Sequence, residues 1–297
     1  MSVIFIFIDG IGVGEQSPYN PLSKNGWDSF AEFTGGDGLD DTFPAVNKKR
    51  ILYKPIDANL GVNGLPQSGT GQTTLFSGVN ASKIAGKHYG PVPFTTTRYL
   101  LQEKSLFHSV LDMEMRPVFM NAYPEIFFKR AKKKNRWTAT TMMARSAGIP
   151  LKTIDDLLKG KALTAEITQK VWREQLGLDV PQITVEEAAS RLLEAAKSHE
   201  LVMYEFYLTD KAGHSMDRAY ADQIRDILNP FLKYTSANLN EKDTLVITSD
   251  HGNLEDLSVK THTRNPVPLF VKGDTESFKE AESIMDVTPG IVETLKK

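Results

Sequence analysis

The stretch VIFIFIDGIGVG, residues 3–14, decides the fold. Residues 3–8 are an unbroken run of β-branched and aromatic side chains, which is typical of a strand that is covered on both faces. Asp9 follows at once, and three alternating glycines come after it. In open α/β sheets, ligands bind beyond the carboxyl ends of the strands. The stretch therefore indicates either a glycine cradle for a nucleotide or an acidic residue held at a strand tip for chemistry.

The composition is that of an ordinary globular protein. The chain has 297 residues, of which 40% are hydrophobic and 24% are charged, and its net charge is −2. It contains no cysteine, so a metal would have to be held by histidines and carboxylates. The dense basic run at 129–134 lies in a helix-like stretch, and we interpret it as a solvated helix face. We therefore expect no nucleic-acid partner.

The opening apolar run also bears on location. Six apolar residues without a cationic flank are too few for a secretory segment or a membrane span, and no other stretch approaches that length. We therefore expect a cytoplasmic protein that has no membrane partner.

Apolar runs of strand length alternate with helical patterns along the chain. Further strands are predicted at 117–122, 203–209, 244–249 and 267–271, and helices at 184–198, 217–235 and 276–295. This alternation predicts an α/β fold with a largely parallel sheet between two layers of helices. We expect one domain over 1–297. Residues 34–66 read as loop with short strands, and 124–180 read as a small helical segment, which we interpret as cap-like.

A second candidate position is Thr70, in the segment LPQSGTGQTTLFSGVNA at 65–81. Two glycines flank Thr70, and a helix is predicted to begin near Thr73. Small neighbours would let a ligand approach the hydroxyl, and helix-start amides favour an anion. No Gly-Lys-Ser/Thr string follows, so this is not a P-loop. The alternative is a plain turn with a Ser/Thr N-cap, just as Asp9 could simply cap its own turn.

Acidic residues and histidines recur near two other predicted strand ends. One strand is predicted to end at Asp210, and His214 follows four residues later. Another runs directly into Asp250 and His251, and His262 lies in the polar loop that comes next. Buried titratable neighbours are costly without a partner or a metal. A single Asp-x-x-x-His is common, but three acidic positions with three histidines predict a metal centre.

These residues together resemble the alkaline phosphatase superfamily, especially its branch of cofactor-independent phosphoglycerate mutases and phosphopentomutases. The strings that carry the resemblance are Asp-Lys-Ala-Gly-His (210–214), Ser-Asp-His-Gly-Asn (249–253) and His-Thr-Arg-Asn-Pro-Val-Pro (262–268). The resemblance implies a three-layer α/β/α sandwich and two divalent metal ions. Zn²⁺ or Mn²⁺ suits the mixed ligands, and Mg²⁺ suits the histidines less well.

The resemblance also implies roles for individual residues. One metal would be held by Asp9, Thr70, Asp250 and His251, and the other by Asp210, His214 and His262. Thr70 would be the nucleophile, activated by the metal, and would form a phosphothreonine-type intermediate.

The expected activity is a two-metal phosphoester hydrolase, either a phosphatase or a phosphodiesterase. The segment between Thr70 and Asp210 is too short for the large domain that the mutases insert there, which favours hydrolysis. A phosphomutase and a sulfate-ester or phosphonate hydrolase remain alternatives, as does a non-catalytic metal-binding protein. A Rossmann-type nucleotide site is disfavoured because Glu15 stands where its third glycine is required, and QSPYNP (16–21) breaks the following helix.

We expect a small phosphorylated substrate, and the sequence leaves the oligomeric state open. Five cations near the predicted site could offer charge to its phosphate, with a solvated loop cation as the alternative for each. They are Lys87, His88, Arg98, Lys211 and Arg264.

Overall fold

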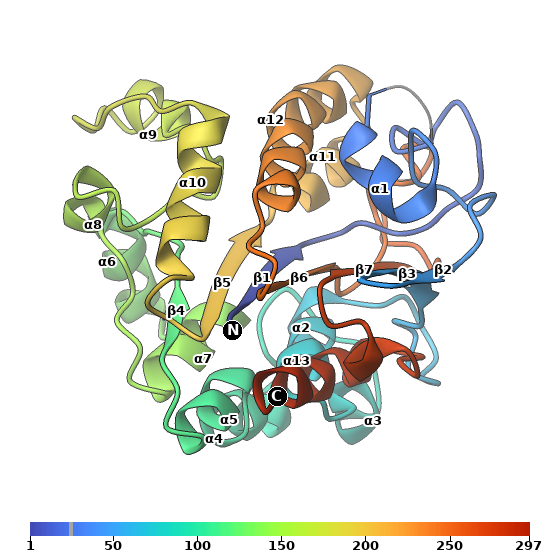
Figure 1. Ribbon diagram of the computed structural model, residues 1–297. Helices are drawn as coiled ribbons and strands as arrows, with labels where there is room; N and C mark the ends of the chain where they lie inside the picture. Colours follow the sequence, from blue (N-terminus) through green and yellow to red (C-terminus); the bar gives the residue numbers. More distant parts are fainter. Residues whose placement is uncertain (24–25) are drawn as a thin grey trace.

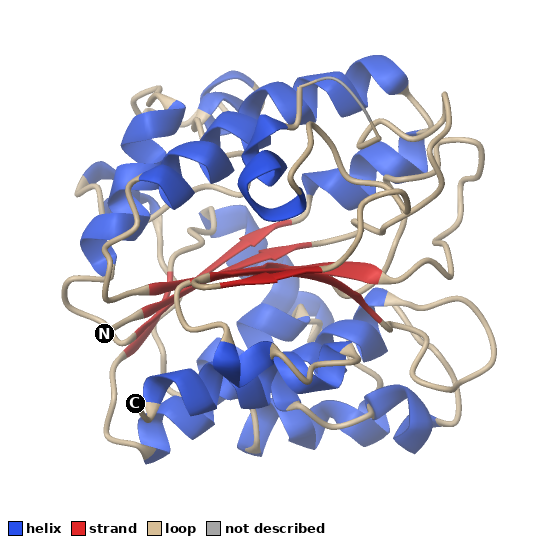
Figure 2. Cartoon of the chain, turned by 45° about the vertical axis from the view of Figure 1, so that its right-hand side comes forward, coloured by secondary structure: helices blue, strands red, loops and turns tan. Residues whose placement is uncertain are grey.

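A seven-stranded sheet lies between two layers of helices, as Figure 2 shows edge-on. This computed structural model describes residues 1–23 and 26–297. The strand order is β2-β3-β7-β6-β1-β5-β4. The three-layer α/β/α architecture predicted from the sequence is confirmed.

The centre of the sheet is parallel. Strand β1 (Val3–Ile8) pairs on one side with β5 (Leu201–Phe206) and on the other with β6 (Thr244–Thr248), and β4 (Pro117–Phe119) adds to β5. All three long central strands are buried along their whole length. Their carboxyl ends therefore lie side by side. Parallel sheets bind ligands beyond the carboxyl ends of their strands.

The other half of the sheet is antiparallel. Strand β7 (Val267–Lys272) runs against β6 and β3 (Ile51–Ile56), and β3 runs against β2 (Val46–Lys48). Strands β2 and β3 are the short strands expected within 34–66. The largely parallel sheet is thus confirmed in its centre, with antiparallel pairing toward this edge.

Alternate side chains of β1 enter two separate cores, because successive residues of a strand point to opposite faces. Ile4, Ile6 and Ile8 pack on one face against α12 (Arg218–Ala237) and α10 (Val185–Ala195). Val3, Phe5 and Phe7 pack on the other face. The helices of that face are α2 (Ser68–Ser77), α4 (Arg98–Glu103), α5 (Leu106–Asp112), α7 (Ala139–Ser146) and α13 (Val287–Leu295).

Two predicted element boundaries were wrong. The strand predicted at 203–209 ends at Phe206, and the chain enters α11 (Leu208–Ser215). The helix predicted at 276–295 begins only at Val287, after two short 3-10 turns. Here the backbone of Asp57 pairs with Glu282 and Ile284, so the intervening peptide groups cannot form a helix.

The segment 124–180 does not form one packing unit. Its helix α7 belongs to the layer beneath the sheet, whereas α6 (Glu125–Lys134), α8 (Ile154–Leu158) and α9 (Lys170–Glu174) lie at the β4 edge beside α10 (Figure 1). A small third core lies here and includes Leu157 and Trp172. The remaining short helices, α1 (Ala31–Thr34) and α3 (Ala81–Ala85), lie at the antiparallel end of the molecule (Figure 1).

None of the helices within 1–23 and 26–297 combines the length and apolar character that crossing a membrane requires.

Candidate metal centre

The central strands bring the predicted ligands together at one edge of the sheet. Asp9 follows β1, and Asp250 and His251 follow its parallel neighbour β6. Asp210 and His214 come from α11, the helix that follows β5. The prediction that a strand ends at Asp210 was wrong. The helix nevertheless brings Asp210 to the other ligands, as the predicted strand end would have done. Residues four apart lie on one helix face, so Asp210 and His214 point the same way.

One ligand group is formed by Asp9, Asp250 and His251, whose ligand atoms all lie within 4.8 Å of one another. The Nε2 atom of His251 is 3.2 Å from Oδ1 of Asp9 and 3.5 Å from Oδ2 of Asp250. All three residues are buried. These are three of the four residues that the resemblance assigned to the first metal.

The second ligand group lies next to the first. Asp210, His262 and His251 satisfy the same 4.8 Å criterion, so His251 adjoins both groups. Asp210 lies 3.4 Å from Nε2 of His214 and 3.5 Å from Nε2 of His262. The structure therefore brings together Asp210, His214 and His262, the residues predicted for the second metal.

The carboxylates fit metal ions because they lack other partners. Oδ1 of Asp9 and both side-chain oxygens of Asp250 are buried without a hydrogen-bond donor. Burying an ionised carboxylate without a partner is very costly, and buried charges in proteins are paired or coordinate metals. A divalent ion held by Asp9 and Asp250 would supply the positive charge that these oxygens lack.

The histidines are oriented as metal ligands are. Nδ1–H of His262 donates to the carbonyl of Pro66 at 2.7 Å, and Nδ1–H of His214 donates to that of Lys260 at 2.8 Å. Because a carbonyl only accepts, the two Nε2 atoms keep their lone pairs, and they face each other at 3.2 Å. Two facing lone pairs require a proton or a metal between them. Such backbone contacts commonly fix the ring of a ligating histidine.

The local charges shift the protonation of the ligands. Burial and the neighbouring Asp9 raise the pKa of Asp250 well above its usual value. Burial alone would lower the pKa of His251, but Asp250 and Asp9 raise it to about 10. Burial likewise opposes ionisation of Asp210, but His262 and His251 lower the pKa of its carboxyl to about 2. In the metal-free protein, protons thus occupy part of the ligand set.

The structure does not bring Thr70 to these ligands. Helix α2 begins at Ser68, earlier than predicted, which places Thr70 within its first turn. The Thr70 hydroxyl accepts a hydrogen bond from the N–H of Tyr89 at 3.0 Å, and its N–H donates to the carbonyl of the same residue at 2.8 Å. The flanking glycines admit protein backbone and not a ligand, since a Cβ on Gly69 would lie 2.2 Å from the carbonyl of Val92.

Ser68 is the hydroxyl of this segment that lies beside the predicted ligands. Its Oγ lies 3.0 Å from Nε2 of His251, at the first residue of α2. One turn later, Gln72 donates to Oδ2 of Asp9 at 3.2 Å. The sequence pointed to Thr70 and not to Ser68 because Thr70 is the hydroxyl that two glycines flank.

A buried carboxylate, Glu255, braces the loops behind the ligands. It accepts hydrogen bonds from the N–H groups of Gly12 and Asn253, at 2.9 and 2.7 Å, and from the side chains of Thr263 and Asn265. A Cβ on Gly12 would lie 2.3 Å from Oε1 of Glu255. The second glycine of the opening stretch thus gives Glu255 the room to support the ligand loops.

Of the five cations predicted to contact substrate, only Lys211 borders the cavity at the metal centre. His88 contacts Ser82 and the carbonyl of Val62, and burial lowers its pKa. Lys87 lies over the rings of Tyr89 and Phe94, and Arg98 donates to the carbonyl of Pro93. Arg264 contributes its backbone carbonyl to Asn59.

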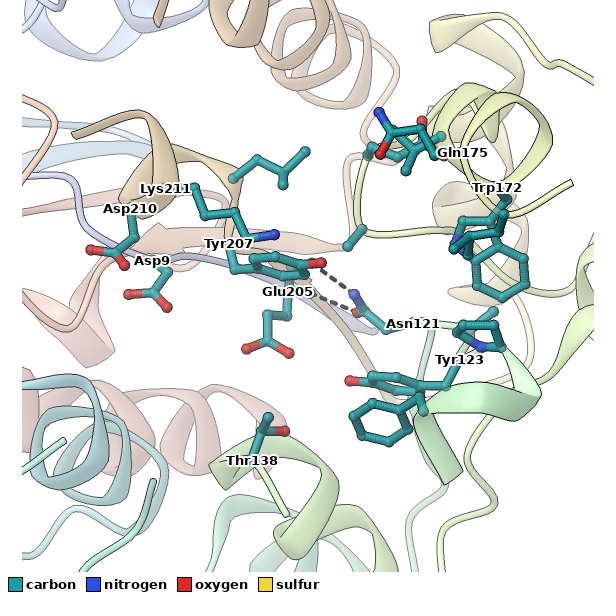
Figure 3. Close-up of a pocket in the computed structure, with 18 of the residues that line it drawn as sticks. Asp9, Asn121, Tyr123, Thr138, Trp172, Gln175, Glu205, Tyr207, Asp210 and Lys211 are labelled. Carbon is teal, nitrogen blue, oxygen red and sulfur yellow. Dashed lines mark hydrogen bonds between the residues drawn. The ribbon is translucent and has the colours of Figure 1, made fainter. Parts of the chain in front are cut away.

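The cavity has a volume of about 1080 Å³ and extends from Asp9, Ser68 and Asp210 toward α6 and α9. Figure 3 shows Asp9 and Asp210 at one side and Trp172 and Gln175 at the other. Glu205 projects into it from β5 and accepts a hydrogen bond from the hydroxyl of Thr140, and burial raises its pKa to about 7. No pattern in the sequence singles out Glu205, because it lies within an otherwise apolar strand.

Comparison with known proteins finds relatives of this chain in sequence and in fold. The model of the Metalloenzyme superfamily matches residues 150–296. The 2,3-bisphosphoglycerate-independent phosphoglycerate mutase of Methanosarcina acetivorans is 31% identical over 157 residues, which cover 46% of this chain and 36% of the mutase. Such matches span only about a quarter to two fifths of the curated mutases.

Solved structures share the fold over nearly the whole chain. A TAB5 alkaline phosphatase mutant superposes with a TM-score of 0.59 and 12% identity, covering 99% of this chain and 97% of that protein. The PH0037 protein of Pyrococcus horikoshii gives a TM-score of 0.57 and 16% identity, covering 99% and 96%.

Fold and ligand set together define a metalloenzyme core of the α/β/α type. Residues 150–296 match the Metalloenzyme superfamily, and the fold over nearly the whole chain is that of solved alkaline phosphatases, in agreement with the resemblance found in the sequence motifs.

Replacing Glu255 with glutamine should weaken metal binding without unfolding the protein. The amide would present hydrogen atoms to groups that themselves donate, so the loops carrying Asn253 and Thr263 should shift. We expect the affinity for Mn²⁺ or Zn²⁺, measured by calorimetry, to fall roughly 10–100-fold. Glu276→Gln, at an exposed site, is the matched control. Unchanged affinity in Glu255→Gln would contradict this supporting role.

Metal binding should release protons. Because the pKa of His251 in the metal-free protein is about 10, its ring is protonated at pH 7.5 and must lose that proton to bind a metal. Affinity should therefore rise with pH below 10, by about tenfold per unit for each proton released. Calorimetry in buffers of different ionisation enthalpy should show at least one proton per chain. His199→Gln should leave that number unchanged, and binding without proton release would refute the prediction.

Proposed function

We propose that this protein is a two-metal phosphoester hydrolase in which Ser68, and not Thr70, is the nucleophile. The observation that carries the proposal is the position of the Ser68 hydroxyl, 3.0 Å from Nε2 of His251, in a residue that lines the cavity. A hydroxyl next to metal ligands and open to a ligand-sized space is the arrangement that nucleophilic catalysis needs. Thr70 is fully buried and is occupied by Tyr89.

Two divalent ions fit this centre. Asp9, Asp250, His251 and Ser68 would hold one, and Asp210, His214 and His262 the other. When bound, such ions lower the pKa of a coordinated hydroxyl and stabilise the charge on the entering and leaving oxygens of a phosphoryl transfer. The mixture of imidazole and carboxylate ligands is suited to Zn²⁺ or Mn²⁺.

The protein's own residues position the phosphate. Ser68 is the first residue of the ten-residue helix α2, whose N-terminal amides favour an anion beside the nucleophile. Gln72, one turn further on, holds Asp9 in place. The Ser68 oxygen would attack phosphorus, the ester oxygen would leave, and water would then release phosphate from the serine. Lys211 lines the cavity within reach of a bound substrate and supplies a positive charge.

Hydrolysis is favoured over phosphoryl return because the segment between Thr70 and Asp210 is too short for the large domain that the mutases insert there. The mutase alternative keeps support from those same relatives, all of which are phosphoglycerate mutases. The two activities differ in their product, since a hydrolase yields free phosphate and a mutase yields an isomer. Phosphomonoesters and diesters are both compatible with the centre.

Ser68→Ala should abolish turnover of p-nitrophenyl phosphate by the Mn²⁺- or Zn²⁺-loaded protein. Losing a covalent nucleophile is expected to cost on the order of 10³-fold or more in kcat. Thr70→Val, at the nearby hydroxyl that faces Tyr89, should retain kcat within about threefold while lowering the melting temperature.

A panel of mono- and diesters, with phosphate release and isomer formation both measured, identifies the reaction. The proposal is refuted if Ser68→Ala keeps full activity, or if Thr70→Val alone is inactive while still folded and metal-loaded. Isomerisation of a phosphosugar or phosphoglycerate without phosphate release would favour the mutase.

A further inference from the structure

We propose that the cavity between the metal centre and helices α6 and α9 binds the organic part of an extended phosphate ester, one with an apolar body and a second negatively charged group. This inference rests on the proposed function, since the metal centre and Ser68 would hold the first phosphate. It adds the class of substrate that the rest of the cavity fits.

The cavity is much larger than a phosphate needs. Its volume is about 1080 Å³, at the upper end of what drug-sized ligands occupy. The metal ligands Asp9 and Asp210 border one side, and Trp172 borders the other (Figure 3). A three-carbon phosphate at the metal centre would leave most of this space filled with water. The dimensions therefore fit a substrate that extends away from the phosphate.

The far walls of the cavity are apolar. Ile126 on α6 and Leu176 just after α9 are 44% and 43% exposed, and both border the cavity. Ile224 of α12 and Trp172 complete this lining from the buried side. Exposed aliphatic side chains that converge on a cavity mark a ligand groove more often than a bare solvent face. They would contact a planar or aliphatic group.

Cations surround this apolar part. Arg130, Lys134, Arg136 and Lys170 border the cavity, and none of them forms an ion pair within residues 1–23 and 26–297. The nearby Glu166 is occupied by the hydroxyls of Thr164 and Thr168, which leaves Glu174 as the acidic neighbour at this end. The excess positive charge fits a carboxylate, sulfate or second phosphate on the substrate.

This proposal gives part of the basic run at 129–134, whose cations are all exposed, a role beyond that of a solvated helix face. The run is the last part of α6, and four of its cations fall into two sets. Arg130 and Lys134, one helical turn apart, border the cavity, whereas Lys132 and Lys133 do not. The two sets are equally charged and exposed, so they provide a matched comparison within one helix.

Binding of non-hydrolysable phosphonates to the metal-loaded protein tests the proposal. Calorimetry would compare methylphosphonate, naphthylmethylphosphonate, and the naphthyl compound with a carboxylate on its far ring. We expect the naphthyl group to raise affinity at least ~10-fold through apolar burial. The added carboxylate should raise it a further ~5-fold through the cations. Equal affinities for the methyl and naphthyl compounds would overturn the proposal.

Paired variants locate the binding. Ile126→Ser with Leu176→Ser should remove most of the naphthyl gain, whereas Leu158→Ser, 55% exposed on α8 and away from the cavity, should not. Arg130→Gln with Lys134→Gln should remove the carboxylate gain alone, whereas Lys132→Gln with Lys133→Gln should preserve it. If the control variants lowered affinity as much as the cavity variants, the proposal would be wrong.

Hydrolysis of p-nitrophenyl phosphate, measured on the same samples, separates this inference from the proposed function. Ser68-dependent hydrolysis without a preference for naphthyl ligands would overturn only the inference. A clear naphthyl preference in a protein that hydrolyses no ester would support the ligand class and refute the hydrolase.

Discussion

Buried carboxylate oxygens without hydrogen-bond donors are the constraint on which the rest of the site depends. Asp9 and Asp250 lie at the ends of adjacent parallel strands, where the sheet and α2 exclude water. Three of their oxygens have no donor. Such a site is stable only with protons or cations in it, and the raised pKa of Asp250 and of His251 shows the proton-filled form. Divalent ions bound in the site would remove the energetic cost of burying these carboxylates without donors.

The surrounding structure keeps this group of ligands from relaxing. Carbonyls of Pro66 and Lys260 orient two imidazoles, Gln72 holds Asp9, and Glu255 ties the loop of the opening glycines to the loop after β6. The glycines of the opening stretch therefore allow close approach of protein groups and do not cradle a nucleotide. Rigid support from outside the ligand set is what a centre for phosphoryl transfer requires.

The sequence predicted those parts of the site that are set by strand ends. Apolar runs locate buried strands reliably, and parallel neighbours must end together, so Asp9, Asp250 and His251 could be placed in advance. Asp210 was predicted to follow a strand directly, whereas it lies in α11 after that strand. Its carboxylate still reaches the ligand group, because α11 begins beside the carboxyl end of β5. The sequence does not show which hydroxyl of a helix start faces the ligands, so it could not point to the contact of Ser68 with His251. The sequence could not show that Arg130 and Lys134 border a cavity, because the rest of its lining comes from residues far away in the chain.

The number of metal ions bound per chain tests the central claim most directly. Elemental analysis of the protein, equilibrated with Mn²⁺ or Zn²⁺ and freed of excess metal, should find close to two ions per chain. Asp250→Asn, which alters only the group with Asp9, should leave close to one. A wild-type protein that retains no divalent metal under these conditions would contradict this account of the site.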